Sequence, residues 1–273
     1  MIKAASLDLG YGDRVILEDL NFEIQRGEFV GFLGPNGSGK STLLHALCGL
    51  LPPLRGSVLM DKVLLQDIPS RRRARRLAVV PQSTEVRFPF SCFELVLMGR
   101  YPHRRRWQSL GDEDLLAALT AMDQTSTTAL QERPVTEISG GERQRVVVAR
   151  ALAQTPEILL LDEATSSMDV RKKLEIFEVL KHLNESLGVT VICAMHDLNL
   201  AALYCGRLMF LKDGRLCQDG PTDTVFTSET LNQVYDTAME VVRHPAHQRP
   251  YAVMLPPFAS LGGQEAATKR ASG

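Results

Sequence analysis

The sequence predicts an α/β protein with a mixed sheet, and three observations support this fold class. Continuous apolar runs typical of buried strands occur at residues 29–33, 158–161 and 189–194, with segments of helical spacing between them. Strands that are apolar on both faces and alternate with helices indicate a parallel sheet covered on both sides. A glycine-rich loop joins the first of these strands to a helix. The 273 residues suffice for one large domain or for a core with a smaller subdomain.

The first part of the chain is expected to be rich in strands. Residues 5–9 and 15–24 have strand character on either side of a glycine-containing turn, and two short strands are predicted at residues 56–60 and 77–80. A proline follows the last of these strands and ends it.

The pattern changes between about Thr84 and Val135. Apolar residues there recur at helical spacing over residues 93–98 and 115–122, which predicts a helical insertion. Further along, Lys212-Asp213-Gly214-Arg215 between two apolar runs predicts a hairpin. The small, polar residues 262–273 are expected to fray.

The composition is that of a soluble globular protein and names no partner by charge. Lys and Arg total 31 against 32 Asp and Glu, for a net charge of -1. No apolar run approaches the roughly 20 residues needed to span a bilayer, and the N-terminus lacks the apolar core of a signal peptide. The cysteines show no paired metal-binding spacing, which favours buried, reduced thiols in a cytosolic protein. They are Cys48, Cys92, Cys193, Cys205 and Cys217.

Residues 34–41, Gly-Pro-Asn-Gly-Ser-Gly-Lys-Ser, have the spacing of a phosphate-binding loop. Glycines let the backbone curl so that successive N–H groups point at one anion, and the following helix adds its dipole. Lys40 can reach the β- and γ-phosphates of a nucleoside triphosphate, and the Ser41 hydroxyl is placed to ligate Mg²⁺. The chain is therefore expected to bind ATP through residues of this loop, which are Gly34, Pro35, Asn36, Gly37, Ser38, Gly39, Lys40, Ser41 and Thr42.

An apolar strand that ends in two acidic residues supplies the other half of such a site. Asp162 at its end is expected to join the Mg²⁺ shell. Glu163 projects elsewhere and is placed to orient or deprotonate the attacking water. The alternative is a strand that merely ends in two acids at its solvent edge.

A second anion site is predicted where a helix begins at Ser139-Gly140-Gly141-Glu142. Alone, this segment would be an ordinary helix cap with a basic face. Beside a complete phosphate loop, it suggests that a partner subunit supplies the second half of the phosphate cradle.

The chain resembles the ATP-binding cassette (ABC) family over nearly all of its length. The phosphate loop, the segment Ile138-Ser139-Gly140-Gly141-Glu142 and the acidic strand at residues 158–163 stand in that family's order. Two departures are mild: Ile138 replaces the usual leucine, and Glu142 stands where glutamine is commoner. Neither removes the serine or the glycines that contact phosphate, so an active enzyme is expected.

The resemblance also assigns single residues. Tyr11 fits the aromatic that stacks on adenine, Gln82 the Q-loop amide that meets Mg²⁺ or water, and His196 the switch histidine. Ser167-Met168-Asp169 fits the D-loop, which places Asp169 at the nucleotide. Taken alone, Tyr11 could be a turn aromatic, Gln82 a solvated loop residue and His196 a core histidine.

The fold that the resemblance implies is a P-loop NTPase core (an ABC ATPase) with a mixed sheet, an antiparallel β subdomain and an inserted α-helical subdomain. The expected parts are the first part of the nucleotide-binding core at residues 1–86 and the helical subdomain at 87–135. The second part of the core follows at 136–227, and a C-terminal extension at 228–273.

The run Met98-Gly99-Arg100-Tyr101-Pro102-His103 is similar to the ATPases that serve importers of ferric siderophores, haem and cobalamin, as is the tail around Val241 and Arg249. Two basic clusters could bind other partners; they are residues 71–76 and residues 104–106 with Trp107. The first is expected to be a solvated helix face rather than a nucleic-acid site. The second is expected to face anionic headgroups or a partner protein.

The sequence therefore predicts an ATP-hydrolysing subunit that forms a homodimer and docks under two transmembrane permease subunits. We expect it at the cytoplasmic face of the membrane as a peripheral protein, with no nucleic-acid partner. A periplasmic or lipoprotein-type binding protein would deliver an iron chelate, haem or cobalamin. The apolar segment Arg87-Phe88-Pro89-Phe90-Ser91 is expected on the surface, where it would line a groove for a short permease helix, unless the rings of Phe88 and Phe90 pack inside the insertion. The alternatives are molybdate or other metal import, export, or a soluble ATPase acting on DNA or ribosomes.

Overall fold

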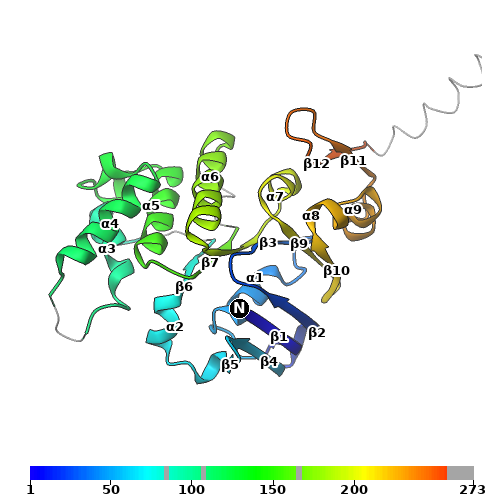
Figure 1. Cartoon of the computed structure of the whole chain (residues 1–273), viewed down its shortest axis with the longest axis horizontal. Helices are drawn as coiled ribbons and strands as arrows, with labels where there is room; N and C mark the ends of the chain where they lie inside the picture. Colours follow the sequence, from blue (N-terminus) through cyan, green and yellow to red (C-terminus); the bar gives the residue numbers. More distant parts are fainter. Residues whose placement is uncertain (83–85, 106–108, 164–167, 257–273) are drawn as a thin grey trace, which may run out of the picture.

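A six-stranded mixed sheet forms the centre of the computed structural model, which describes residues 1–82, 86–105, 109–163 and 168–256 (Figure 1). β10 is antiparallel to β9, and the other neighbours run parallel. The hairpin expected near Gly214 is the β9–β10 connection. In spatial order the strands are β10 (Arg215–Pro221), β9 (Arg207–Lys212), β3 (Phe29–Leu33), β8 (Thr190–Ala194), β7 (Ile158–Asp162) and β6 (Leu77–Val80).

The central strands are buried on both faces, as their apolar runs predict. Side chains alternate across a strand, so Val30 and Phe32 on β3 join one hydrophobic cluster while Phe29 and Leu33 join the other. Every residue of β3, β7 and β8 is buried. The predicted parallel sheet with two covered faces is therefore confirmed.

A four-stranded antiparallel sheet lies over one face of the central sheet. α1 (Lys40–Leu47) packs between the two sheets, because Leu43, Leu44 and Leu47 share one cluster with residues of both. The strand-rich first part of the chain and its antiparallel sheet are thus confirmed. In spatial order the strands are β2 (Arg14–Ile24), β1 (Ile2–Tyr11), β4 (Arg55–Met60) and β5 (Val63–Leu64).

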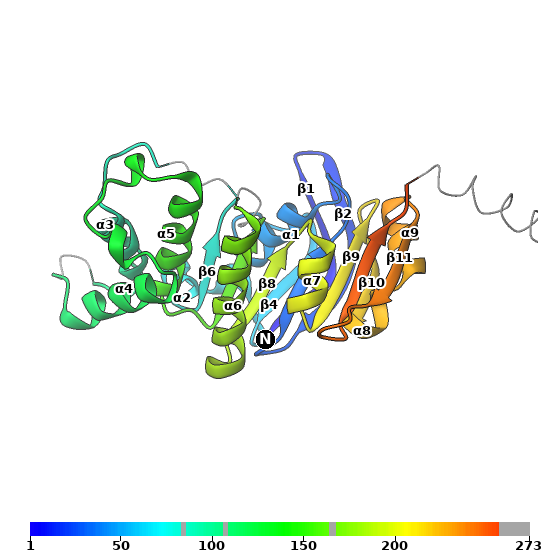
Figure 2. The ribbon, with the colours of Figure 1, turned by 90° about the horizontal axis from the view of Figure 1, so that it is seen from above.

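A group of three helices, α3, α4 and α5, packs together at one end of the molecule (Figures 1 and 2). This confirms the helical subdomain of the expected fold class. α5 begins beyond residue 135 and also contacts β6, so it joins the helical group to the sheet. The helices that follow α1 in the chain, these three included, are α2 (Ser70–Arg76), α3 (Cys92–Leu97), α4 (Asp112–Gln124), α5 (Gly140–Ala153), α6 (Val170–Leu187), α7 (Leu198–Tyr204), α8 (Thr222–Val225) and α9 (Ser228–Tyr235).

The C-terminal hairpin of β11 (Met239–Arg243) and β12 (Pro250–Met254) lies against α7. The Asn199 amide fixes it by hydrogen bonds to both backbone groups of Ala252. Four short 3-10 helices complete the described elements: η1 (Leu65–Asp67), η2 (Met98–Arg100), η3 (Thr128–Leu130) and η4 (Val135–Glu137). None of the helices in these described ranges is both long and apolar enough to cross a membrane.

Residues of the run 98–103 hold the helices of this group together. A Cβ on Gly99 would lie 2.2 Å from the carbonyl oxygen of Arg150, so only glycine permits this approach to α5. Arg100 is 3% exposed; its Nε donates to Asp114 Oδ1 at 2.9 Å and its Nη1 to the Ala153 carbonyl at 2.9 Å. These residues therefore fasten α4 and the C-terminal end of α5 to η2.

The basic cluster at residues 71–76 forms α2, but it is not simply a solvated face. Arg73 donates to the carbonyls of Leu65 and Gly49, and Arg76 pairs with Asp61 and Glu157. The expectation of a solvated face was therefore wrong for these two arginines, because neighbouring loops present carbonyls and carboxylates to them. Arg106, Trp107, Ser167 and residues 262–273 lie outside the described residues.

Four of the cysteines are buried, as predicted, and burial raises the pKa of the thiols of Cys48, Cys92, Cys193 and Cys205. Cys217 is exposed, contrary to the prediction, because it lies on the edge strand β10.

Candidate active site

The glycine-rich loop runs from the end of β3 to the start of α1, the strand and helix that the sequence predicts around it. Gly34 has a φ of +152°, and a Cβ there would lie 2.1 Å from the carbonyl oxygen of Leu211. Gly39 caps α1 with a φ of +97°, and a Cβ there would lie 2.7 Å from Leu17 Cγ. Both positions therefore require glycine for backbone geometry and for space.

The loop is built to hold an anion. The first N–H groups of α1 have no partner within the helix and point into the loop. Lys40 is buried, and among the described residues its Nζ donates to two backbone carbonyls, those of Gly34 at 2.9 Å and Pro35 at 3.1 Å. Burial lowers the pKa of Lys40, against the opposing effect of Glu163 and Asp162. The Ser38 hydroxyl is buried and has no hydrogen-bond partner in the part of the chain that the structure describes. The Lys40 ammonium and the Ser38 hydroxyl are donors that fit the phosphates of a nucleotide.

Ser41 and Asp162 meet at the edge of this loop. The Ser41 hydroxyl donates to Asp162 Oδ1 at 2.7 Å, and Asp162 is 6% exposed. Hydroxyl and carboxylate oxygens are the ligands that Mg²⁺ prefers, so the pair fits that cation. His45, one helical turn after Ser41, places its Nε2 at 3.9 Å from Asp162 Oδ2. His45 was not among the predicted site residues, although its i, i+4 spacing from Ser41 could have revealed it.

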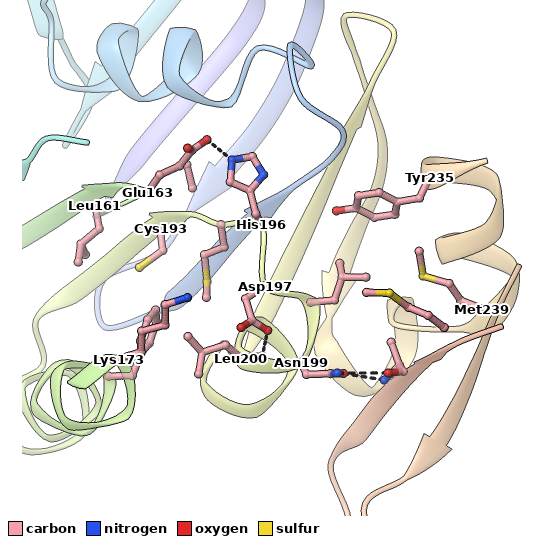
Figure 3. Close-up of a pocket in the computed structure, with 16 residues that line it drawn as sticks. Leu161, Glu163, Lys173, Cys193, His196, Asp197, Asn199, Leu200, Tyr235 and Met239 are labelled. Atoms are coloured by element: carbon pink, nitrogen blue, oxygen red, sulfur yellow. Dashed lines mark hydrogen bonds and ion pairs between the residues drawn. The ribbon is translucent and has the colours of Figure 1, made fainter. Parts of the chain in front are cut away.

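Glu163 turns away from Asp162, as expected, because its backbone adopts a φ of +48°. Its carboxylate receives a hydrogen bond from Gln82 Nε2 at 2.8 Å on one oxygen and contacts His196 Nε2 with the other. Figure 3 shows this second contact at the end of the sheet. The structure thus brings Gln82, Glu163 and His196 together from three separate segments of the chain.

A cavity of about 540 Å³ joins the loop to this carboxylate. Arg14 and Ile16 line this cavity but were not among the predicted site residues. They belong to β2, which carries no local sequence motif that could have indicated them. Tyr11 is not among the lining residues; it is 52% exposed, with its hydroxyl 3.5 Å from His45 Nδ1. The lining residues are Arg14, Ile16, Asn36, Gly37, Gly39, Lys40, Ser41, Thr42, Gln82, Glu163 and His196.

The segment at the start of α5 does not contribute to that lining within the described residues. Ser139 caps the helix, and the Glu142 carboxylate accepts hydrogen bonds from the Ser139 amide at 2.8 Å and from the Ser139 hydroxyl at 2.7 Å. These hydrogen bonds hold the pKa of Glu142 below its usual range. Asp169 caps α6 in the same way through the Lys172 amide. Among the described residues, neither helix start therefore lines the cavity of the phosphate loop of its own chain.

Fold and site together define a nucleotide-hydrolysing cassette. The family model described as ABC transporter matches residues 17–166, and the chain belongs to that family. It is an ATP-binding ATPase of the ABC class, with relatives among the ATP-binding proteins of siderophore, haem and cobalamin importers.

Three relatives illustrate the similarity in sequence. The hemin import ATP-binding protein HmuV of Gloeobacter violaceus is 42% identical over 93% of this chain and 94% of its own length. The cobalamin import ATP-binding protein BtuD of Halobacterium salinarum is 39% identical over 98% of this chain and 69% of its length. The uncharacterised ABC transporter ATP-binding protein YvrA of Bacillus subtilis is 38% identical over 96% of this chain, which spans only 60% of YvrA.

Two solved structures are similar in fold. An ABC transporter of metal-chelate type in an inward-facing conformation gives a TM-score of 0.82 at 28% identity, over 93% of this chain and 97% of the other. The MJ0796 cassette, a dimer bound to ADP and phosphate after hydrolysis, gives a TM-score of 0.73 at 31% identity. That match covers 81% of this chain and 99% of the other.

Proposed function

We propose that this chain is the ATP-hydrolysing subunit that powers uptake of an iron chelate such as a ferric siderophore, of haem or of cobalamin through a partner permease. The observation that carries the catalytic part is the position of Glu163. Its carboxylate is held by Gln82 and His196 at the cavity of the phosphate loop, beside the Ser41–Asp162 pair. The import function is supported by the relatives whose names give hemin and cobalamin import.

In this proposal the loop of residues 34–42 wraps the phosphates, and Tyr11 stacks on the adenine. Lys40 exchanges its two carbonyl partners for the β- and γ-phosphates, since a buried cation gains more from an anion than from neutral oxygens. Ser41, Gln82 and Asp162 hold Mg²⁺, which neutralises charge on the phosphate oxygens. Glu163 accepts a proton from the attacking water, and His196, on its other oxygen, fixes the orientation of that carboxylate.

A second copy of the chain completes the site. The helix starts at residues 139–142 and at Asp169 do not line the loop cavity of their own chain among the described residues, so we expect them to act on the nucleotide bound by the partner. The residues concerned are Ser139, Gly140, Gly141, Glu142 and Asp169. The dimeric MJ0796 cassette supports a homodimer of this kind. Each nucleotide then lies between the loop of one copy and the α5 start of the other, and hydrolysis releases the two halves.

The permease is proposed to dock on Phe88 and Phe90. The two side chains are 69% and 37% exposed, with ring centroids 6.0 Å apart, so they form an apolar patch beside the helical group. Two permease subunits, one per copy, would hold the homodimer at the cytoplasmic face of the membrane. A periplasmic or lipoprotein-type binding protein supplies the substrate to the permease, and nucleic acid takes no part.

Glu163→Gln tests the catalytic part. It should slow ATP hydrolysis by roughly 10²–10⁴-fold, the usual contribution of a general base, while ATP binding persists and a nucleotide-bound dimer accumulates. Glu240→Gln on exposed β11 is the matched control and should hydrolyse ATP normally. Hydrolysis by Glu163→Gln at the rate of that control would refute the assignment. Proteoliposomes with the cognate permease, loaded in turn with haem, a ferric siderophore, cobalamin and molybdate, decide the substrate class.

A further inference from the structure

A tyrosine from the C-terminal part of the chain contacts the phosphate loop. The Gly34 N–H donates to Tyr235 Oη at 3.0 Å, across 201 residues of sequence. Gly34 lies beyond the last residues that β3 pairs with its neighbours, Leu33 with Phe210 and Phe32 with Ala194. Its amide therefore has no strand partner, and Tyr235 supplies the acceptor. Figure 3 shows the ring reaching from α9 towards the strand ends that carry His196.

The last turn of α9 is itself fixed to the sheet. Lys212 at the end of β9 donates from Nζ to the Gln233 carbonyl at 2.6 Å and to the Asp236 carboxylate at 2.8 Å. The preceding residue, Leu211, contributes the carbonyl that excludes any Cβ at Gly34. The same strand end thus holds both the glycine and the helix turn that carries Tyr235, so the geometry of their contact is well defined.

We propose that Tyr235 is a positioning residue that holds the phosphate loop ready for ATP. This inference rests on the proposed function, in which the loop wraps the phosphates. Lys40 donates to the Gly34 carbonyl in the present structure but leaves it for the phosphates when ATP binds. The Tyr235 bond is then the side-chain contact that continues to hold Gly34, whose missing Cβ leaves its torsions otherwise free.

The phenol is suited to this role because it stays neutral. Burial raises the pKa of Tyr235 to about 12, so its oxygen is a hydroxyl throughout the physiological range. Tyr235 also lines a cavity of about 550 Å³ together with Glu163 and His196 (Figure 3). The C-terminal part of the chain therefore borders the site on two sides, at the loop and at the catalytic carboxylate.

Tyr235→Phe keeps the ring and removes only the acceptor. It should raise the KM for ATP by roughly threefold to tenfold, the factor that corresponds to the net free energy of one neutral hydrogen bond. Without that bond, a larger fraction of the ATP-free protein has its loop outside the binding conformation. The kcat should stay within about twofold of the wild-type value, because Tyr235 makes no hydrogen bond to Glu163 or His196 among the described residues. A general loss of stability would instead lower kcat and the active fraction together.

Tyr204→Phe is the matched control, since it removes the hydrogen bond that another tyrosine, which is buried, donates to Glu178 Oε1 at 2.7 Å. It should leave the KM unchanged. Residue-resolved hydrogen exchange separates a local effect at the loop from a general loss of stability, which would speed exchange throughout the sheet. In Tyr235→Phe the Gly34 amide should exchange at least tenfold faster, while the Val30 amide on β3 stays protected.

If Tyr235→Phe is poorly folded, Asp236→Asn keeps the tyrosine and weakens only the Lys212 contact; it should shift KM in the same direction by a smaller factor. An unchanged KM for ATP in Tyr235→Phe would overturn the inference alone, whatever the exchange rate of the Gly34 amide. Normal ATP binding by Lys40→Ala would instead overturn the proposed nucleotide site, so the two failures are distinguishable.

Discussion

Arg100→Met is expected to destabilise the protein by about 3–5 kcal/mol at neutral pH, the usual cost of leaving one member of a buried ion pair without its partner. Arg100 is 3% exposed and Asp114 8% exposed, and their Nε–Oδ1 distance is 2.9 Å. The substitution also removes the donor that satisfies the Ala153 carbonyl at the end of α5. Methionine fills much of the space of the arginine stem, so the expected loss is mainly electrostatic rather than a cavity effect.

The loss should depend on pH in a defined direction. Burial alone would raise the pKa of Asp114, but the hydrogen bond from Arg100 and the Gly111 amide hold it below its usual range. The pair therefore stabilises the fold above the unfolded-state pKa of Asp114, and this contribution is lost as the pH falls through the folded-state pKa. Without Arg100, burial dominates and raises the pKa of Asp114, so the carboxyl takes up a proton more readily. The deficit of the variant relative to wild type should therefore shrink as the pH is lowered.

Urea unfolding followed by circular dichroism at pH 8 and pH 5 measures both effects. Arg71→Met is the control, because that arginine is exposed and donates only to the Pro102 carbonyl among its described contacts. The double variant Arg100→Met/Asp114→Leu should recover most of the lost stability, since no buried charge remains. A deficit below about 1 kcal/mol at pH 8, or one that grows towards pH 5, would refute the reasoning.

Three further predictions concern the site and its partners. Gly39→Ala should weaken ATP binding more than tenfold in a fluorescent-nucleotide titration, because the added Cβ would lie 2.7 Å from Leu17 Cγ. At Gly37 an added Cβ meets open space, so Gly37→Ala should lose less ATP affinity; equal losses of affinity in the two variants would argue against the collision. Ser139→Arg and Lys40→Ala should each be inactive alone, while their mixture regains ATPase activity from one intact site per heterodimer; hydrolysis by either subunit as a monomer would contradict the shared site. Phe90→Asp should keep the ATPase activity of the isolated subunit but lose uptake with the permease in proteoliposomes, and normal uptake would reject that docking surface.

The sequence was sufficient to predict the parts of the fold that depend on local pattern. The strands around Val30 and Leu160 have no polar face, which requires a sheet covered on both sides, and the structure places them at its centre. The phosphate loop was equally predictable, because glycine spacing reports backbone torsions directly. Gly34 and Gly39 lie where a side chain cannot fit.

Contacts between distant segments were not predictable in this way. Arg73 and Arg76 were expected to be solvated, because their partners, such as Glu157, lie far away in sequence. Arg14 reaches the cavity only because β2 folds over the loop, and Tyr235 reaches Gly34 across most of the chain. No spacing rule links such residues, since tertiary packing alone brings them together.

The two adjacent acids show how local and distant effects combine. Consecutive residues of a strand point to opposite faces, which already predicts different surroundings for Asp162 and Glu163. The structure adds a φ of +48° at Glu163, a torsion that is costly for a residue with a side chain and persists only where the surroundings impose it. Hydrogen bonds from the Glu163 amide to Ala194 and from Gln82 to its carboxylate provide that constraint. Loss of either contact should therefore release the carboxylate from its catalytic orientation, although neither involves the phosphate loop itself.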